Sequence, residues 1–187
     1  MKFNSIKKIH EGRFITRYDV SYTTENGHEK IYEMISRRKD MLTLSDLNNP
    51  KIDAVVLVIF DEKHERVLIN KEFRLAPGCF VYNFPAGLID EGETYEEAAA
   101  RELMEETGLT LVSVEDVIGE SYSAVGFSNE KNLTVVGTAK GELRKSNDSE
   151  FEEIVPGWYT KEEVAALLKE APFAGRTQAF CYMFAKS

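Results

Sequence analysis

A run of acidic residues from Asp90 to Glu106 is the part of this sequence best suited to chemistry. It holds eight carboxylates, with Arg101 as the single cation among them: Asp90, Glu91, Glu93, Glu96, Glu97, Glu102, Glu105 and Glu106. Most charge runs are solvated helix faces. Here, however, Glu102, Glu105 and Glu106 would share one face within one helical turn, where two like charges about 5 Å apart repel by roughly 3 kcal/mol at an effective dielectric of 20.

A cluster of this kind favours a bound divalent cation. Oxygen ligands without His or Cys select Mg²⁺ or Mn²⁺ over zinc. A metal that bridges phosphate oxygens neutralises their charge and makes hydroxide available near neutral pH. The chain is acidic, with 23 Lys+Arg against 32 Asp+Glu and a net charge of -9. This balance argues against a nucleic-acid binder, which needs clustered cations, but a metal would still allow an anionic substrate to bind.

A helix over residues 94–107, closed by Gly108, is expected to carry these carboxylates. The run AVVLVIF at 54–60 is typical of a strand buried on both faces, with RVLIN at 66–70 as its partner. Further expected elements are strands near 110–119, 132–139 and 152–159, a helix after Thr160 with Val164, Leu167 and Leu168 inward, and a last helix with Phe180, Met183 and Phe184 inward. This order predicts an α/β sandwich with a mixed sheet.

The first 50 residues predict a separate β-hairpin. Residues 14–22 alternate with a period of two, and residues 30–35 return as a second strand. Between them, Asn26-Gly27 is typical of a type I′ turn. Two strands alone are marginal in water, so the hairpin must pack on its own core or on a second subunit. We therefore expect an extension over 1–50 and a main domain over 51–187.

Cysteine usage and hydropathy point to a cytoplasmic protein. Cys79 and Cys181 cannot form a disulfide framework, and two reduced thiols are the simplest interpretation. The N-terminal residues carry positive charge without the apolar segment of a signal peptide. The longest apolar run, 54–60, is too short to span a bilayer. We therefore expect no membrane partner.

The segment GLIDEGETYEEAAARELMEETGL, residues 87–109, resembles the signature of the Nudix family. It matches at all nine defined positions, namely Gly87, Glu93, Arg101, Glu102, Leu103, Glu105, Glu106, Gly108 and Leu109. Average residue usage gives a chance match on the order of 10⁻⁹ per starting position. The resemblance implies an α/β/α Nudix fold and metal-dependent hydrolysis of a nucleoside diphosphate linked to another moiety.

The same resemblance implies roles for the matching residues. Glu102 and Glu106 would ligate the metal, and Glu105 would hold metal or water as a catalytic residue. Glu93 would pair with Arg101 to fix the loop that Gly87 opens. All the carboxylates of the signature are present, whereas family members that only bind nucleotides often lack some of them.

The preceding segment KEFRLAPGCFVYNFPAG, residues 71–87, resembles the branch of the family that hydrolyses ADP-ribose and ADP-sugars. That likeness implies that Arg74 contacts the substrate phosphates and that the carbonyl of Ala86 is a further metal ligand. The alternatives are a surface ion pair for Arg74 and a turn shaped by Pro85 and Gly87.

The N-terminal hairpin also resembles this branch, in which aromatic side chains of two strands stack on adenine across a swapped homodimer. Phe14 and Tyr32 match the stacking positions, Arg37 the assisting arginine, and Glu33 lies near the nucleotide. Stacking of one base on an aromatic ring contributes about 1–3 kcal/mol. The alternative is that both aromatics belong to the core of the sheet.

A second acidic segment, SNDSEFEEIVPGWYT at 146–160, matches the place from which this branch delivers a late glutamate to the metal or water. Glu150 matches best, with Asp148 and Glu153 nearby; the alternative is a solvated loop. Two departures from the pattern of this branch argue against ADP-ribose itself more than against ADP-sugars in general. Residues 123–130 lack the proline of the usual Ser-Pro-Gly, and Asn83 stands where Glu is common.

We therefore expect a Mg²⁺-dependent (or Mn²⁺-dependent) hydrolase that cleaves ADP-ribose or a related nucleotide sugar to a nucleoside monophosphate and a sugar phosphate. Its partners would be that small molecule and a second copy of the chain. Alternatives are another nucleoside diphosphate derivative as substrate (a dinucleoside polyphosphate or a nucleoside triphosphate) and a non-catalytic nucleotide-sensing module.

Overall fold

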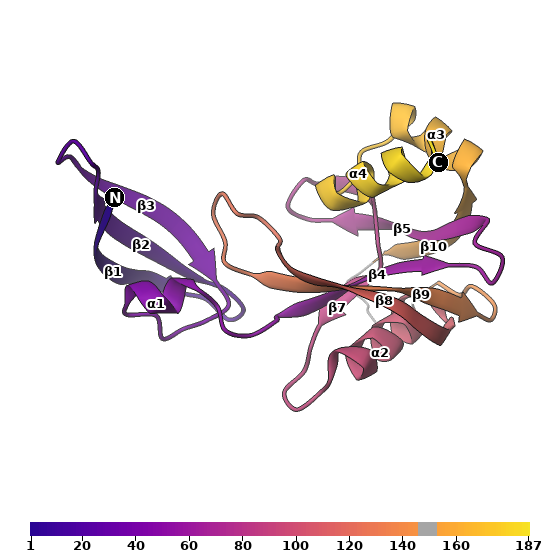
Figure 1. Ribbon diagram of the computed structural model, residues 1–187, viewed down its shortest axis with the longest axis horizontal. Helices are drawn as coiled ribbons and strands as arrows, with labels where there is room; N and C mark the ends of the chain where they lie inside the picture. Colours follow the sequence, from indigo (N-terminus) through magenta and orange to yellow (C-terminus); the bar gives the residue numbers. More distant parts are fainter. Residues whose placement is uncertain (146–152) are drawn as a thin grey trace. The chain divides into compact units, whose positions relative to one another are not determined.

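The computed structural model describes residues 1–145 and 153–187. The chain forms two compact units, whose elements Figure 1 shows. The N-terminal unit contains Met1–Asp53 and Glu120–Asn132. The second unit, called the α/β unit below, contains Ala54–Gly119 and Leu133–Ser187. The N-terminal unit is thus built from two stretches that lie far apart in the sequence.

One seven-stranded sheet organises the α/β unit. Its order is β10-β5-β4-β9-β8, with β6 paired to β5 and β7 paired to β4. The strands are β4 (Ala54–Phe60), β5 (Arg66–Arg74), β6 (Cys79–Asn83), β7 (Ala86–Leu88), β8 (Thr110–Tyr122), β9 (Lys131–Lys140) and β10 (Ile154–Thr160). The tips of β8 and β9 belong to the N-terminal unit. The helices are α2 (Tyr95–Thr107), α3 (Lys161–Glu170) and α4 (Gly175–Phe184).

Helices cover both faces of this sheet, as Figure 1 shows. Side chains of β4 alternate between two apolar clusters. Val55, Leu57 and Ile59 pack with α2, whereas Val56 and Val58 pack with α3 and α4. This burial on both faces is why the whole of β4 is apolar. The predicted α/β/α sandwich and the buried strand over 54–60 are confirmed.

Local signals fix the ends of α2. The Thr94 hydroxyl accepts a hydrogen bond from the Glu97 N–H, while the Glu97 carboxylate accepts one from the Thr94 N–H at 2.8 Å. Gly108 ends the helix with φ of 76°, a left-handed conformation that suits glycine. The predicted helix over 94–107 is confirmed.

Two other features of the α/β unit differ from the sequence prediction. Strands β6 and β7 were not predicted, and β7 pairs Ala86 with Val56 of β4. In α4, Met183 is 67% exposed, so its predicted place in the core is wrong. Phe184 is buried as predicted, together with Thr177 and Cys181, at a spacing that puts these three on one face of the helix.

The N-terminal unit has a three-stranded sheet in the order β1-β2-β3, with a single helical turn, α1 (Leu44–Leu47). Strands β2 (Thr16–Thr23) and β3 (Glu29–Ser36) form the predicted hairpin. Strand β1 (Lys2–Glu11) was not predicted, because its side chains are largely exposed and carry no apolar alternation. Buried Tyr18, Val20, Met34 and Met41 form the core of this unit.

The turn between β2 and β3 is longer than predicted. The Gly27 N–H donates to Thr24 O at 3.0 Å, and the Thr24 N–H donates to His28 O at 2.9 Å. Gly27 has φ of 80°, whereas Asn26 is outside the left-handed region. The type I′ prediction is therefore wrong. The hydrogen bonds indicate a type I turn followed by a glycine bulge.

Across residues 1–145 and 153–187, none of the helices combines the length and apolar character needed to cross a bilayer.

Candidate functional site

Arg101 of α2 joins the loop before the helix to the helix itself. Its Nε and Nη2 donate to the Glu93 carboxylate at 2.8 and 2.9 Å, and Nη2 also donates to Leu88 O at 2.9 Å. The Asp90 N–H donates to the same carboxylate at 3.0 Å. The Arg101 hydrogen bonds, followed by that of Asp90, lower the pKa of Glu93 to about 2. The structure thus brings together Glu93 and Arg101, the pair that was predicted to fix this loop.

Glu102 lies between Arg101 and the backbone of β7. Its Oε1 accepts a hydrogen bond from Arg101 Nη1 at 2.7 Å. A Cβ atom added at Gly87 would meet the Glu102 Cδ at 1.8 Å, so only glycine leaves room for this carboxylate. Burial raises the pKa of Glu102 from 4.5, although Arg101 opposes that shift.

Arg101 also reaches Glu105, whose Oε2 lies 3.3 Å from Nη1 and whose side chain is 45% exposed. The repulsion inferred from the sequence for this face of the helix is therefore partly offset by Arg101. Sequence analysis recognised Arg101 as the single cation of the acidic run. It did not predict that Arg101 would pair with Glu102 and Glu105 as well as with Glu93.

Glu106 points from α2 toward strand β5 and is 9% exposed. Its Oε2 accepts a hydrogen bond from Asn70 Nδ2 at 2.6 Å. Asn70 is fully buried, and its Oδ1 has no hydrogen-bond partner among the described residues. Asn70 was not predicted from the sequence. The available signal was a polar residue at the end of the apolar run RVLIN.

Arg74 stands at the end of β5 with its side chain 53% exposed. Its Nη1 lies 3.8 Å from Glu72 Oε2, so it forms a long ion pair and remains accessible. Glu72 is buried and accepts a hydrogen bond from Asn83 Nδ2 at 2.9 Å. The Phe73 N–H donates to Glu153 O at 3.1 Å, which places the exposed Glu153 beside this strand. Glu150 and Asp148 lie outside the described residues.

The donor set of this site fits a hard divalent cation. Its side-chain donors are carboxylate and amide oxygens, the ligands that Mg²⁺ and Mn²⁺ prefer. Two structural observations agree with this: Gly87 leaves room for the Glu102 carboxylate, and Asn70 Oδ1 has no hydrogen-bond partner among the described residues. However, within residues 1–145 and 153–187, no three His, Cys, Asp or Glu side chains lie close enough together to hold a metal ion.

The base-binding candidates lie in the N-terminal unit. Phe14 is 66% exposed, just before the start of β2, and the Arg13 guanidinium carbon lies 5.0 Å from its ring centroid. Tyr32 of β3 is 41% exposed, and its hydroxyl hydrogen-bonds to Gly126 O. The alternative assignment of both aromatics to the sheet core is therefore wrong. Arg37 pairs with Glu130 at 2.5 Å.

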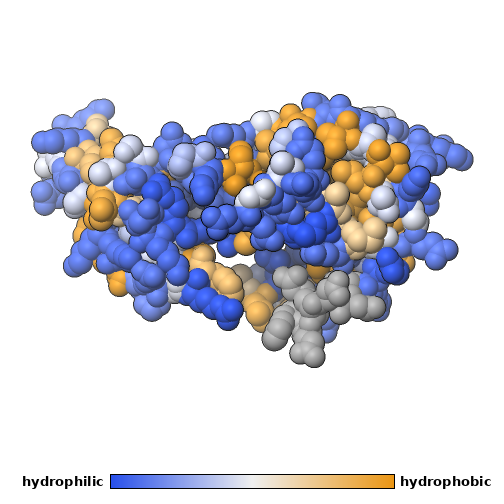
Figure 2. All heavy atoms as spheres, turned by 90° about the horizontal axis from the view of Figure 1, so that it is seen from below, coloured by the Kyte–Doolittle hydropathy of each residue, from blue (hydrophilic) through white to orange (hydrophobic). Residues whose placement is uncertain are grey.

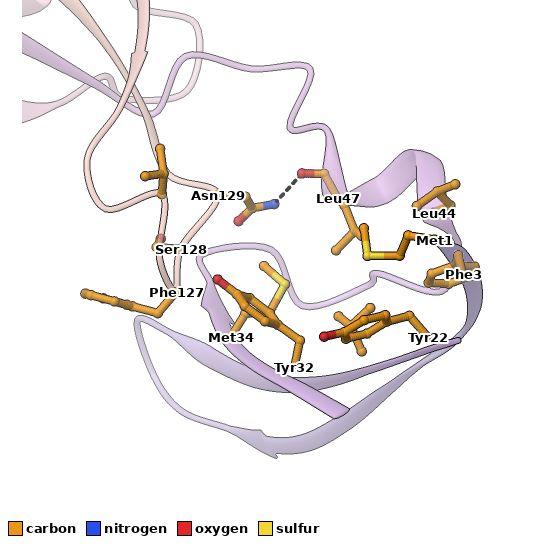
Figure 3. A pocket seen from close by; sticks show the side chains of 12 residues that line it. Met1, Phe3, Tyr22, Tyr32, Met34, Leu44, Leu47, Phe127, Ser128 and Asn129 are labelled. Carbon is orange, nitrogen blue, oxygen red and sulfur yellow. Dashed lines mark hydrogen bonds between the residues drawn. The ribbon is translucent and has the colours of Figure 1, made fainter. Parts of the chain in front are cut away.

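Tyr32 lines an apolar cavity of about 550 Å³, which Figure 3 shows. Phe3, Tyr22, Met34 and Phe127 contribute to the same walls. Phe14 is not among the described residues that line it. The two aromatics that the sequence paired are thus placed differently, one at a cavity and one on the open surface.

The profile of the NUDIX domain matches residues 50–179, which is more than half of the chain. A solved structure described as an ADP compounds hydrolase aligns with 100% of this chain and 93% of its own, with a TM-score of 0.70. At 20% identity, that likeness shows the fold. The chain belongs to the Nudix family of hydrolases.

Among curated relatives, the mouse ADP-sugar pyrophosphatase is 30% identical over 161 residues, covering 79% of this chain and 68% of its own. The ADP-ribose pyrophosphatase of Saccharomyces cerevisiae is 28% identical, covering 70% of this chain and 54% of its own. The NAD-capped RNA hydrolase NUDT12 of Macaca fascicularis is 28% identical over 88% of this chain. The chain spans 35% of that protein, so it corresponds to one part of it.

Proposed function

We propose that this chain is a Mg²⁺-dependent hydrolase that cleaves the pyrophosphate of ADP-ribose or a related ADP-sugar. The products would be a nucleoside monophosphate and a sugar phosphate. The observation that carries the proposal is the complete set of signature carboxylates on α2 and the loop before it, with Glu102 seated against Gly87 and Glu106 buried against Asn70. The names of the mouse and yeast relatives support the substrate class.

The residues divide the chemistry among themselves. Glu102, Glu106 and the carbonyl of Ala86 would hold the metal, which when bound neutralises the diphosphate and makes a hydroxide available. Arg74 is accessible enough to bind a phosphate oxygen through its guanidinium. Glu105 is exposed on the same helix and would accept the proton of the attacking water, with Glu153 and Glu150 as the other candidates for that role.

The base would be bound by the N-terminal unit. The cavity beside Tyr32 has the size and apolar lining of small-molecule sites. Phe14 does not line this cavity, and Arg37 forms an ion pair with Glu130. Both remain proposed contacts of the base, in a homodimer that completes the site. Sedimentation of the pure protein at several concentrations tests this dimer; a monomer at all concentrations would contradict it.

A substrate panel tests the reaction. ADP-ribose, ADP-glucose, a dinucleoside polyphosphate, a nucleoside triphosphate and an NAD-capped RNA are each incubated with Mg²⁺, with and without EDTA. We expect AMP and a sugar phosphate from the ADP-sugars, resolved by chromatography, and no product with EDTA. Faster turnover of another class would replace the proposed substrate. Tight binding without any product would favour the nucleotide-sensing alternative.

A further inference from the structure

Asn70 is an unusual residue for its position in β5. Alternate residues of a strand share a face, so Leu68, Asn70 and Glu72 point to the same side of the sheet. Leu68 packs in the apolar cluster with Leu103 of α2. Asn70 is fully buried in the same layer, where an amide loses its hydration and must find partners in the protein. Its partner is Glu106 of α2.

The contact with Glu106 fixes the orientation of the amide. An ionised carboxylate can only accept hydrogen bonds, so the nitrogen of Asn70 must face Glu106 and the oxygen must point elsewhere. The 2.6 Å distance is short for an N–H···O hydrogen bond, and a hydrogen bond to an ionised acceptor is stronger than a neutral one. The oxygen then remains buried, without a hydrogen-bond partner among the described residues. A buried acceptor in that state is costly unless a donor or a cation satisfies it.

We propose that Asn70 is a positioning residue of the metal centre. Its amide nitrogen holds the Glu106 carboxylate in place by a hydrogen bond. Its amide oxygen would gain a partner from the bound ion or from a water molecule of that ion. This inference rests on the proposed function, because it assumes that Glu106 is a metal ligand. Residues that hydrogen-bond to a metal ligand change metal affinity by about 10–100-fold when they are removed.

The test measures ion binding without substrate or turnover. Free Mn²⁺ is titrated by electron paramagnetic resonance against the wild-type protein and Asn70→Leu, in which a side chain of similar size removes both polar atoms. We expect the Mn²⁺ Kd to rise about 10–100-fold. Asn129→Leu is a matched control. Asn129 is also buried, and its Oδ1 has no partner within residues 1–145 and 153–187, but it lies in the N-terminal unit and donates to Leu47 O. Its Mn²⁺ Kd should not change.

The outcomes separate this proposal from the previous one. An unchanged Kd in folded Asn70→Leu, with normal Mn²⁺ binding by the wild type, overturns the role of Asn70 alone. Absence of Mn²⁺ binding by the wild type overturns both. Normal Mn²⁺ behaviour with no hydrolysis of the panel overturns the proposed substrate and leaves Asn70 in its role. If Asn70→Leu does not fold, Asn70→Ala and Asn70→Ser replace it, and an unchanged Kd in both overturns the proposal.

Discussion

The two units of this protein bury their sheets to different extents. In the α/β unit, apolar clusters lie on both faces of the sheet, beneath α2 on one side and beneath α3 and α4 on the other. In the N-terminal unit, one small cluster around Tyr18 and Met34 forms the core. Large apolar side chains there remain exposed, including Phe14, Ile31 and Phe127. Figure 2 shows that hydrophobic residues reach the surface on one face of the molecule.

This difference indicates which kind of function each unit is suited to. A carboxylate constellation must be held within a fraction of an ångström, which requires a rigid scaffold covered on both faces. A surface that recognises a base or a second subunit instead needs apolar groups that remain accessible. We therefore expect changes in the α/β unit to act on the chemical step, and changes in the N-terminal unit to act on binding.

Removal of a proposed metal ligand should have the largest effect. Glu106→Gln keeps the shape of the side chain but loses its charge, and we expect kcat to fall by about three orders of magnitude, equivalent to about 4 kcal/mol. Glu91→Gln is the control, because Glu91 is an exposed residue of the same segment. Initial rates on ADP-ribose measure both. A near-normal kcat in Glu106→Gln would contradict the assignment of the chemical step to the α/β unit.

Loss of a side chain that we propose to stack on the base should act on KM. Tyr32→Ala should raise KM about 5–150-fold with little change in kcat, because base stacking contributes about 1–3 kcal/mol. Phe14→Ala should act in the same direction if the dimer brings it to the base. The control is Ile31→Ala, which removes the 67% exposed neighbour on β3. A fall in kcat at constant KM would contradict the division between the units.

Crowding the Glu102 carboxylate should cost both stability and rate. In Gly87→Ala the new methyl group meets that carboxylate, and we expect about 1–3 kcal/mol lower unfolding free energy. Gly119→Ala is the control, since a Cβ there meets nothing within 4 Å. Urea denaturation followed by circular dichroism measures both variants. Equal stability of the two would mean that Glu102 can move aside without cost.

Acid should weaken the Glu93–Arg101 contact by a smaller amount. The folded pKa of Glu93 is about 2, below its ordinary value of 4.5. Its stabilising contribution is therefore complete above pH 4.5 and is lost as the pH falls toward 2. Urea midpoints between pH 6 and pH 3 should fall less steeply for Glu93→Gln than for the wild type. Parallel curves would show that this pair does not couple to folding.

Sequence alone located the parts of the site that depend on local signals. Thr94 and Glu97, three positions apart, mark the start of α2, and Gly108 marks its end, so its boundaries could be predicted. Met183 could not be separated from Cys181, because both lie near the apolar stripe and packing against the sheet decides between them. Asn70 meets Glu106 across 36 positions, and nothing in their spacing indicates that contact.

Strand β8 ends, and strand β9 begins, in a tip (Glu120–Asn132) that belongs to the N-terminal unit. In this unit the Ile35 N–H donates to Phe127 O at 2.8 Å, and Asn129 donates to Leu47 O. No single cut in the chain can therefore release either unit intact. A shortened protein that starts at Ala54 would keep the tip without its companions and leave Phe127 with no neighbouring strand. Grafting the N-terminal unit onto another enzyme would require transplanting two separate stretches of sequence at once.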